Sequence, residues 1–70
     1  MHQLPFARGE RVKLREPYAR ALMLGRRQID WLKRRGTVVY CNPTVVHVRW
    51  DGRRSVDNLP IKGVEIAYDR

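Results

Sequence analysis

The chain has 70 residues and a formal net charge of +8 at pH 7, because fifteen Lys and Arg residues stand against seven Asp and Glu residues. A chain this short forms at most one domain and buries only about 60% of its unfolded surface, which argues against an enzyme with a large cleft. Cys41 is its single cysteine, which excludes an internal disulfide bond and a cysteine-rich zinc site. We interpret Cys41 as a small residue at a strand end rather than as a reactive thiol.

The N-terminal residues 1–8 form a leading segment before the first predicted strand. This segment lacks the basic stretch followed by an apolar run that marks a secretory signal, and no apolar run elsewhere is long enough to span a membrane. We therefore expect a cytoplasmic protein with no membrane partner. The first strand is predicted over residues 9–15, where Val12 and Leu14 alternate with polar residues and should face the core.

Residues 17–34 are predicted to form an insertion between the first two strands. A proline at the start of this segment suits the first turn of a helix. Ala19, Leu22 and Met23 follow the i, i+3, i+4 spacing of one helix face, and Gly25 is expected to end this first short helix. The remainder of the insertion is either helical or an irregular loop. Connections of this length inside a small domain are often functional.

Residues 35–68 predict a three-strand meander followed by a closing strand. Asn-Pro and Asp-Gly dipeptides separate the strands of the meander, and Asp-Gly favours a two-residue turn. In the second strand Val46, Val48 and Trp50 fall on one face, which we assign to the core. The three predicted strands are Val38–Tyr40, Thr44–Trp50 and Arg54–Asn58.

The end of the chain predicts a tight turn and a last strand. Pro60 is expected to end the third strand of the meander. Ile61 to Gly63 can form a single helical turn, and Val64 to Tyr68 then forms the closing strand. The chain contains no internal repeat, low-complexity tract or linker, so residues 1–70 are interpreted as one domain.

This order of elements, with its short motifs, resembles an SH3-like barrel. Gly36 to Val39, followed by Val46 to Gly52, resembles the KOW and Tudor-like branches of that group, and Leu59 to Ile66 resembles their closing signature. Val48 to Arg53 is also similar to a stretch of the small SH3-like proteins encoded by phages and prophages. The resemblance implies a mainly β fold, a small five-stranded SH3-like barrel with a helical or irregular insertion between strands 1 and 2.

Basic residues cluster in the predicted insertion, where Asp30 is the only acidic residue between Tyr18 and Arg35. Arginine binds phosphates in a bidentate manner, and an exposed aromatic ring can stack on a base, so this pattern favours contact with DNA or RNA. Trp31 has a second interpretation, since it can instead cap the barrel. The candidate nucleic-acid-binding residues of this segment are Arg20, Arg26, Arg27, Trp31, Lys33, Arg34 and Arg35.

A second group of basic residues surrounds the predicted turn after Trp50. Arg53 and Arg54 follow the Asp-Gly dipeptide, and Arg49 lies on the preceding strand. This group either joins the basic insertion or forms a separate face, and both alternatives remain open from the sequence. A solvated turn without a binding role is the simpler interpretation.

A protein-interaction module, for example a phage or prophage accessory factor that docks on an acidic protein, is the alternative function. Tyr18 and Met23 are candidate apolar anchors for such a partner. Tyr40 and His47 are expected on the outward faces of adjacent strands, where they form either a partner site or an ordinary cross-strand pair. A small homo-oligomer is a third possibility, and the oligomeric state stays open.

Catalytic motifs are missing from the sequence. The seven carboxylates are scattered, the only serine, Ser55, has no nucleophile-elbow pattern, and no glycine-rich phosphate loop occurs. Two distant histidines and one cysteine do not make a metal site. We therefore expect a non-enzymatic protein without a cofactor.

Overall fold

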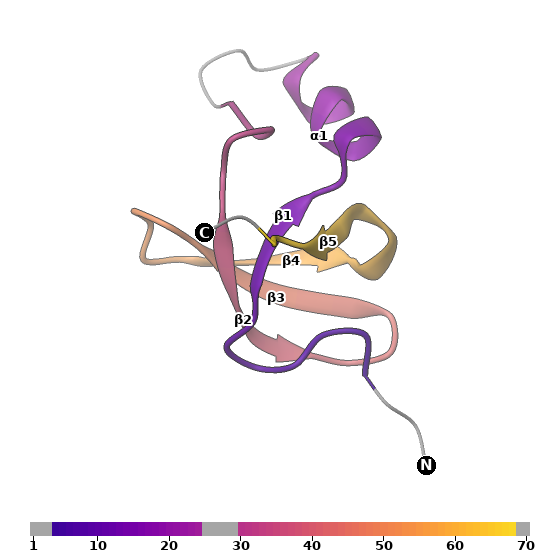
Figure 1. Ribbon diagram of the computed structural model, residues 1–70, viewed down its shortest axis with the longest axis vertical. Helices are drawn as coiled ribbons and strands as arrows, with labels where there is room; N and C mark the ends of the chain where they lie inside the picture. Colours follow the sequence, from indigo (N-terminus) through magenta and orange to yellow (C-terminus); the bar gives the residue numbers. More distant parts are fainter. Residues whose placement is uncertain (1–3, 25–29, 69–70) are drawn as a thin grey trace.

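The structure is a computed structural model that describes residues 4–24 and 30–68. It contains one five-stranded antiparallel sheet and a short helix after the first strand, which is consistent with a small SH3-like barrel and confirms the mainly β fold class (Figure 1). The elements are β1 (Arg11–Leu14), α1 (Glu16–Met23), β2 (Gly36–Cys41), β3 (Val45–Trp50), β4 (Val56–Pro60), the 3₁₀-helix η1 (Ile61–Gly63) and β5 (Val64–Ile66).

The strand order is β4-β3-β2-β1-β5, so the meander of β2, β3 and β4 continues through β1 to the closing strand. β1 pairs with β2 along one edge and with β5 along the other, so the first and last strands of the chain are neighbours in the sheet. Helix α1 lies beyond the end of β1, away from the meander (Figure 1). This arrangement leaves the outer face of β1, β2 and β3 available for side chains that do not serve the core.

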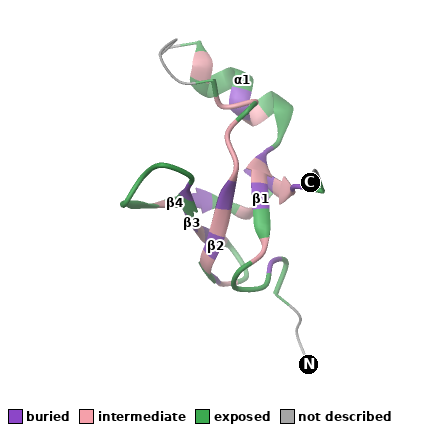
Figure 2. Cartoon of the chain, turned by 60° about the vertical axis from the view of Figure 1, so that its left-hand side comes forward, coloured by how far each residue is buried: buried purple, intermediate pink, exposed green. Residues whose placement is uncertain are grey.

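The core lies on the inner face of the sheet, and Figure 2 shows the buried residues along the strands. The predicted alternation is confirmed, because Val12, Val46, Val48 and Trp50 are all 0% exposed and Leu14 is almost fully buried. Burial of each such side chain contributes on the order of 1.5–3 kcal/mol. The small core therefore depends on a few β-branched side chains packed around one large indole ring.

Gly36 is required where β2 packs closely against β3. A Cβ atom at this position would lie 2.5 Å from Val48 Cγ1, 2.8 Å from Trp50 Cε3 and 2.9 Å from the carbonyl oxygen of Arg49. Real Cβ atoms do not approach other atoms this closely, so only glycine fits without a shift of the strands. Gly36 thereby allows the close packing of β2 on the indole ring.

A β-bulge interrupts the pairing of β2 with β3 at Val39. The register passes from Val38 opposite Val48 directly to Tyr40 opposite His47, so Val39 has no partner. As a result the buried positions of β2 are Gly36 and Val38, in regular alternation, and then Cys41, three residues after Val38. Val39 and Tyr40 both leave the core, and the free thiol of Cys41 is buried there instead.

The third strand of the meander begins later than predicted. β4 starts at Val56 rather than Arg54 and includes Pro60, and five residues rather than a two-residue turn connect it to β3. The amide of Arg53 donates to the carbonyl oxygen of Trp50 at 3.0 Å, which makes a turn with Gly52 at φ +84°. Because β4 is an edge strand, the missing N–H of a proline at its last position is tolerated.

The predicted short helix of the insertion is present as α1, and residues 30–34, later in the insertion, form no helix. α1 ends at Met23, and its buried Ala19 faces the core, while Gly25 lies outside the described residues. The predicted helical turn before the last strand is confirmed as η1. The closing strand ends at Ile66 rather than Tyr68, although the amide of the following Ala67 still donates to the carbonyl oxygen of Arg11 at 3.0 Å.

Candidate functional site

The two basic segments predicted from the sequence meet at one end of the barrel. The amide of Asp51 donates to the carbonyl oxygen of Arg35 at 2.9 Å. In addition, Nη1 of Arg34 donates to the carbonyl oxygen of Asp51 at 3.1 Å. The turn after β3 and the segment before β2 are therefore bonded to each other, which places Arg34 of the insertion at this turn.

Arg11 of β1 joins this site, although it was not among the binding residues predicted from the sequence. Its guanidinium donates to both carboxylate oxygens of Asp51, at 2.8 and 2.5 Å, and to Oγ1 of Thr37 at 3.0 Å. Alternation along β1 places Arg11 on the outer face, because the neighbouring Val12 is buried. That alternation was the available signal for an outward arginine, but its partner lies 40 residues away and no local pattern points to it.

Arg49 completes a row across the outer face of the sheet. The pairing places Arg11 opposite Thr37, and Thr37 opposite Arg49. The Arg49 side chain is exposed and makes no hydrogen bond or ion pair within the described part of the chain. We call the set of arginines on this row and around the neighbouring turn the Arg-rich end; it consists of Arg11, Arg34, Arg49, Arg53 and Arg54.

Two carboxylates lie within the Arg-rich end and leave it with an excess of positive charge. The hydrogen bonds from Arg11 lower the pKa of the Asp51 carboxyl below its usual value of 3.8; desolvation opposes this shift, and the positive charge of Arg11 adds to it. Asp57 is 4.0 Å from Nη1 of Arg53. Since Asp51 remains ionised at neutral pH, five guanidinium groups face two negative charges.

The other predicted basic residues serve local contacts or lie elsewhere. On α1, Nε of Arg20 is 3.6 Å from Oε1 of Glu16. In the segment before β2, Nζ of Lys33 is 4.0 Å from Oδ2 of Asp30. Arg35 is half-buried, and its Nη1 donates to the carbonyl oxygens of Leu32 at 3.3 Å and Arg34 at 2.9 Å, so it orders the segment before β2. The predicted binding residues Arg26 and Arg27 lie outside the described residues.

Trp31 packs on the core with one side of its ring. Its indole ring meets that of Trp50 edge to face, with ring centroids 5.5 Å apart and an angle of 71° between the planes. The ring is half-buried, so part of its surface still faces solvent. Of the two interpretations made from the sequence, the packing of Trp31 against the barrel is therefore present in the structure.

The predicted partner-binding residues fall into two places. Tyr18 is half-buried on α1, and its ring lies against Gly63, where an added Cβ would be only 2.9–3.1 Å from ring carbons. Met23 is half-buried at the end of the same helix. Tyr40 and His47 form the expected cross-strand pair on the outer face, with ring centroids 5.2 Å apart and the rings at 76°.

The described residues contain no group of three or more His, Cys, Asp and Glu side chains that could hold a metal ion. Within residues 4–24 and 30–68, no helix is long and apolar enough to cross a membrane. Comparison with protein-family models, with curated proteins and with solved structures finds no match.

Proposed function

We propose that this protein is a non-enzymatic nucleic-acid-binding β-barrel that contacts phosphates through its Arg-rich end. The observation that carries this proposal is the convergence of guanidinium groups from β1, β3, the segment before β2 and the turn after β3. Elements far apart in the chain contribute arginines to one surface. These arginines outnumber Asp51 and Asp57, so the net charge of the surface is positive. Guanidinium groups bind phosphate oxygens with two parallel hydrogen bonds, which suits a sugar-phosphate backbone.

The internal bonds of the Arg-rich end favour a preformed surface. Arg34 is oriented by a hydrogen bond to the carbonyl oxygen of Asp51, so it loses little side-chain freedom when a ligand arrives, whereas the guanidinium of Arg11 is paired with the Asp51 carboxylate. Arg49 and Arg54 are exposed and make no ion pair among the described residues, so their charge is available. Phosphate contacts alone carry no sequence information, and we propose binding without base-specific reading. The resemblance to KOW-like barrels agrees with this function, and we place the protein in the cytoplasm, where nucleic acid is accessible.

The test compares two double variants that remove the same charge from different surfaces. Arg49→Ala/Arg54→Ala removes two uncommitted guanidinium groups from the Arg-rich end. Arg15→Ala/Lys62→Ala is the matched control, because both residues are exposed and Lys62 lies beside the Pro43 turn, at the opposite end of β3. Fluorescence anisotropy with labelled DNA and RNA oligonucleotides over a salt series gives the affinity and the slope of log K against log salt.

We expect the Arg49→Ala/Arg54→Ala variant to bind more weakly and its salt slope to fall by about one unit for each phosphate contact removed. The control variant should keep the slope of the wild type. No binding by the wild type at low salt, after copurified nucleic acid is removed, contradicts the proposal. Equal losses in the two variants contradict the Arg-rich end as the site, since they indicate only a general effect of net charge.

We propose a protein-interaction module, such as a phage or prophage accessory factor, as the second candidate. The exposed apolar surface of α1 favours it, because Leu22 is 38% exposed and Leu24 is 88% exposed directly after the helix. Apolar side chains beside Arg20 suit a partner with an acidic rim around an apolar patch. The Leu22→Ser/Leu24→Ser variant should then lose a nuclease-resistant partner and keep its affinity for oligonucleotides. A partner retained by this variant would argue against docking through α1.

A further inference from the structure

The bulge at Val39 changes which face of β2 carries the aromatic ring of Tyr40. In a regular strand with Val38 buried, Tyr40 would also point into the core. The unpaired Val39 shifts the alternation by one residue, so Cys41 takes the inner position and Tyr40 is 56% exposed. Bulges re-aim side chains in this manner at functional sites. The bulge therefore presents a large aromatic ring on the outer surface of the sheet.

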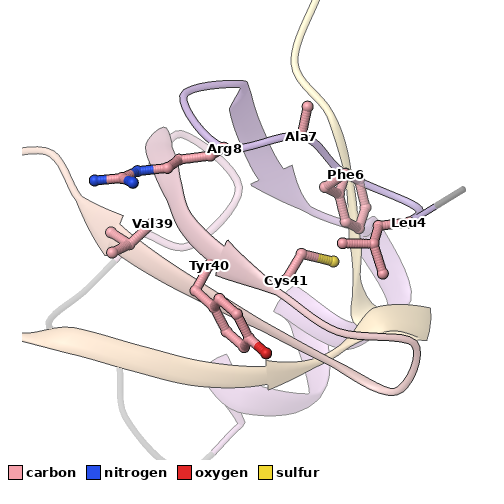
Figure 3. Close-up of a pocket in the computed structure, with 7 residues that line it drawn as sticks. All are labelled: Leu4, Phe6, Ala7, Arg8, Val39, Tyr40 and Cys41. Carbon is pink, nitrogen blue, oxygen red and sulfur yellow. The ribbon is translucent and has the colours of Figure 1, made fainter.

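An open groove of about 590 Å³ runs beside this ring, between the N-terminal residues 4–8 and β2. Figure 3 shows Val39 and Tyr40 along the β2 side of the groove and Phe6 and Leu4 on the opposite side. Arg8 extends toward the side of the groove where Val39 lies, away from Phe6 and Leu4 (Figure 3). The groove is lined by Leu4, Phe6, Ala7, Arg8, Val39, Tyr40 and Cys41.

The ring of Tyr40 is held in place from one side. His47 on β3 contacts it at nearly a right angle, with the ring centroids 5.2 Å apart. The contact orients the tyrosine ring while more than half of the residue remains exposed. An exposed ring that is already oriented loses little conformational freedom when a flat ligand stacks on it. This property distinguishes Tyr40 from Trp31, which is packed on the core indole.

Uncommitted positive charge is present in the groove that Tyr40 lines and on the neighbouring strand β3. Arg8 is exposed at the groove and makes no side-chain hydrogen bond or ion pair in the described part of the chain. Arg49 lies on the same outer face of β3 as His47, two residues further along the strand. Arg49 also belongs to the Arg-rich end, so β3 carries both a member of that surface and His47, the partner of Tyr40. A flat apolar site flanked by guanidinium groups matches a base with its neighbouring phosphates.

We propose that the groove at Tyr40 binds an unpaired base of single-stranded nucleic acid. The base stacks on the Tyr40 ring, and Arg8 and Arg49 neutralise the phosphates on either side of it. This proposal rests on the proposed function and names its ligand class. Paired bases in a duplex do not offer their faces for stacking, whereas both single strands and duplexes offer phosphates. The groove should therefore make the protein bind single strands more tightly than duplexes. Stacking is tolerant of base identity, so no sequence preference is required.

The test measures the affinity of Tyr40 variants for single-stranded and duplex oligonucleotides of about 12 nucleotides. Tyr40→Ala removes the ring, and Tyr40→Phe keeps it and removes only the hydroxyl group. Tyr68→Ala is the matched control, because Tyr68 is 86% exposed and lies outside the groove. Anisotropy is recorded with single-stranded DNA, single-stranded RNA and duplex DNA at one salt concentration. Circular dichroism and thermal unfolding show whether each variant keeps the fold.

We expect Tyr40→Ala to weaken binding to single strands by about 5- to 150-fold, which corresponds to the loss of one stacked base. Tyr40→Phe and Tyr68→Ala should stay within about twofold of the wild type, and duplex binding should change equally little in all three variants. Arg8→Ala should lower the salt slope for single strands by about one unit or less. This pattern supports a base-stacking site at the groove.

Other outcomes overturn the proposal in distinguishable ways. If the wild type binds neither single strands nor duplexes, the proposed function itself fails. If the wild type binds both and Tyr40→Ala binds single strands as well as the wild type does, only the stacking site fails. An equal loss for single strands and duplexes assigns Tyr40 to backbone contact instead. Loss of a nuclease-resistant protein partner with unchanged oligonucleotide binding assigns the groove to a protein and also overturns the proposal.

Discussion

Arg11 and Asp51 are 40 residues apart in the chain and form a bidentate ion pair on the outer face of the sheet. The guanidinium nitrogens lie 2.8 and 2.5 Å from the two carboxylate oxygens. The pair connects the first strand to the turn after β3, and the same turn also accepts a hydrogen bond from Arg34. This turn therefore depends on contacts from two other parts of the chain for its position.

The ion pair should give a small contribution to stability that depends on pH. The pKa of Asp51 is lowered in the folded state from its usual value of 3.8, so the contribution is present above that value and is lost as the pH falls through the lowered pKa. Both side chains are about half exposed, which limits the expected contribution to about 0.2–1 kcal/mol. Urea unfolding of the wild type and Asp51→Asn at neutral and acidic pH measures it. A difference in unfolding free energy between the two proteins that persists in strong acid would show that the charge of Asp51 does not cause the stabilisation.

The Asp51→Asn variant should also strengthen binding to nucleic acid, if the proposed function is correct. Removal of this carboxylate deletes one negative charge from the Arg-rich end and releases the guanidinium of Arg11 for phosphate. We expect tighter binding at low salt and a salt slope that increases by about one unit. The anisotropy titrations described above measure both quantities. Asp30→Asn is the control, since Asp30 lies outside the Arg-rich end and pairs with Lys33. Weaker binding by Asp51→Asn would mean that the orientation of Arg11 matters more than its free charge.

Substitution of Gly36 should destabilise the protein more than substitution of Gly63. An alanine at position 36 meets the backbone oxygen of Arg49 and two core side chains, none of which can move freely. We expect Gly36→Ala to lower the free energy of unfolding by about 1–3 kcal/mol, or to prevent folding. Gly63→Ala meets only the ring of Tyr18, which can shift toward solvent. Chemical denaturation of the two variants gives the comparison, and the reverse order would contradict the described packing of β2 on β3.

Asn42 should be important for the turn between β2 and β3. Its Oδ1 accepts hydrogen bonds from the amides of Thr44 and Val45, at 2.9 and 2.7 Å, and from the Thr44 hydroxyl at 3.2 Å. Asn42→Ala removes the acceptor and should cost about 1 kcal/mol of stability. Asn42→Asp keeps the oxygen and is expected to remain close to the wild type. A similar loss in both variants would indicate that the side-chain amide nitrogen, rather than Oδ1, is required.

Trp31 should contribute to stability through its contact with Trp50. Replacement of a half-buried aromatic ring by alanine is expected to cost about 1–3 kcal/mol, part of which comes from the edge-to-face contact. Trp31→Phe keeps an aromatic ring and should retain most of this energy. Unfolding is followed by circular dichroism, because both rings contribute to the fluorescence. A Trp31→Ala variant as stable as the wild type would show that the ring contact does not stabilise the fold.

The inner face of the sheet was predictable because one physical pattern decides it. Val46, Val48 and Trp50 alternate with polar residues, and a one-residue slip would expose all three, so their orientation follows from burial alone. The start of β4 was not predictable in the same way. Asp-Gly signalled a turn, but its length depends on the pairing of Arg49 with Val56, which no local residue reveals.

The candidate site was only partly predictable because it is assembled from distant segments. The positive charge of the turn and of the segment before β2 was visible in the sequence, whereas their connection through Arg34 and Asp51 is a contact across 17 residues. The bulge at Val39 likewise arises from strand pairing and has no signal in the residue pattern. The outward orientation of Tyr40 was predicted beside His47, whereas the groove next to this ring was not, because it also depends on where residues 4–8 lie.

The bulge in β2 determines which positions of the strand can accept substitutions during evolution. Because Val39 and Tyr40 both lie outside the core, substitutions at these positions leave the packing of Val38 and Cys41 intact. Positions 39 and 40 can therefore acquire new side chains at little risk to folding, whereas Phe6 and Cys41 of the groove belong to the core. Gly36 has no such freedom, since any larger side chain meets the neighbouring strand. In a lineage that carries this fold, positions 39 and 40 can change with the ligand that is bound, while the glycine stays the same.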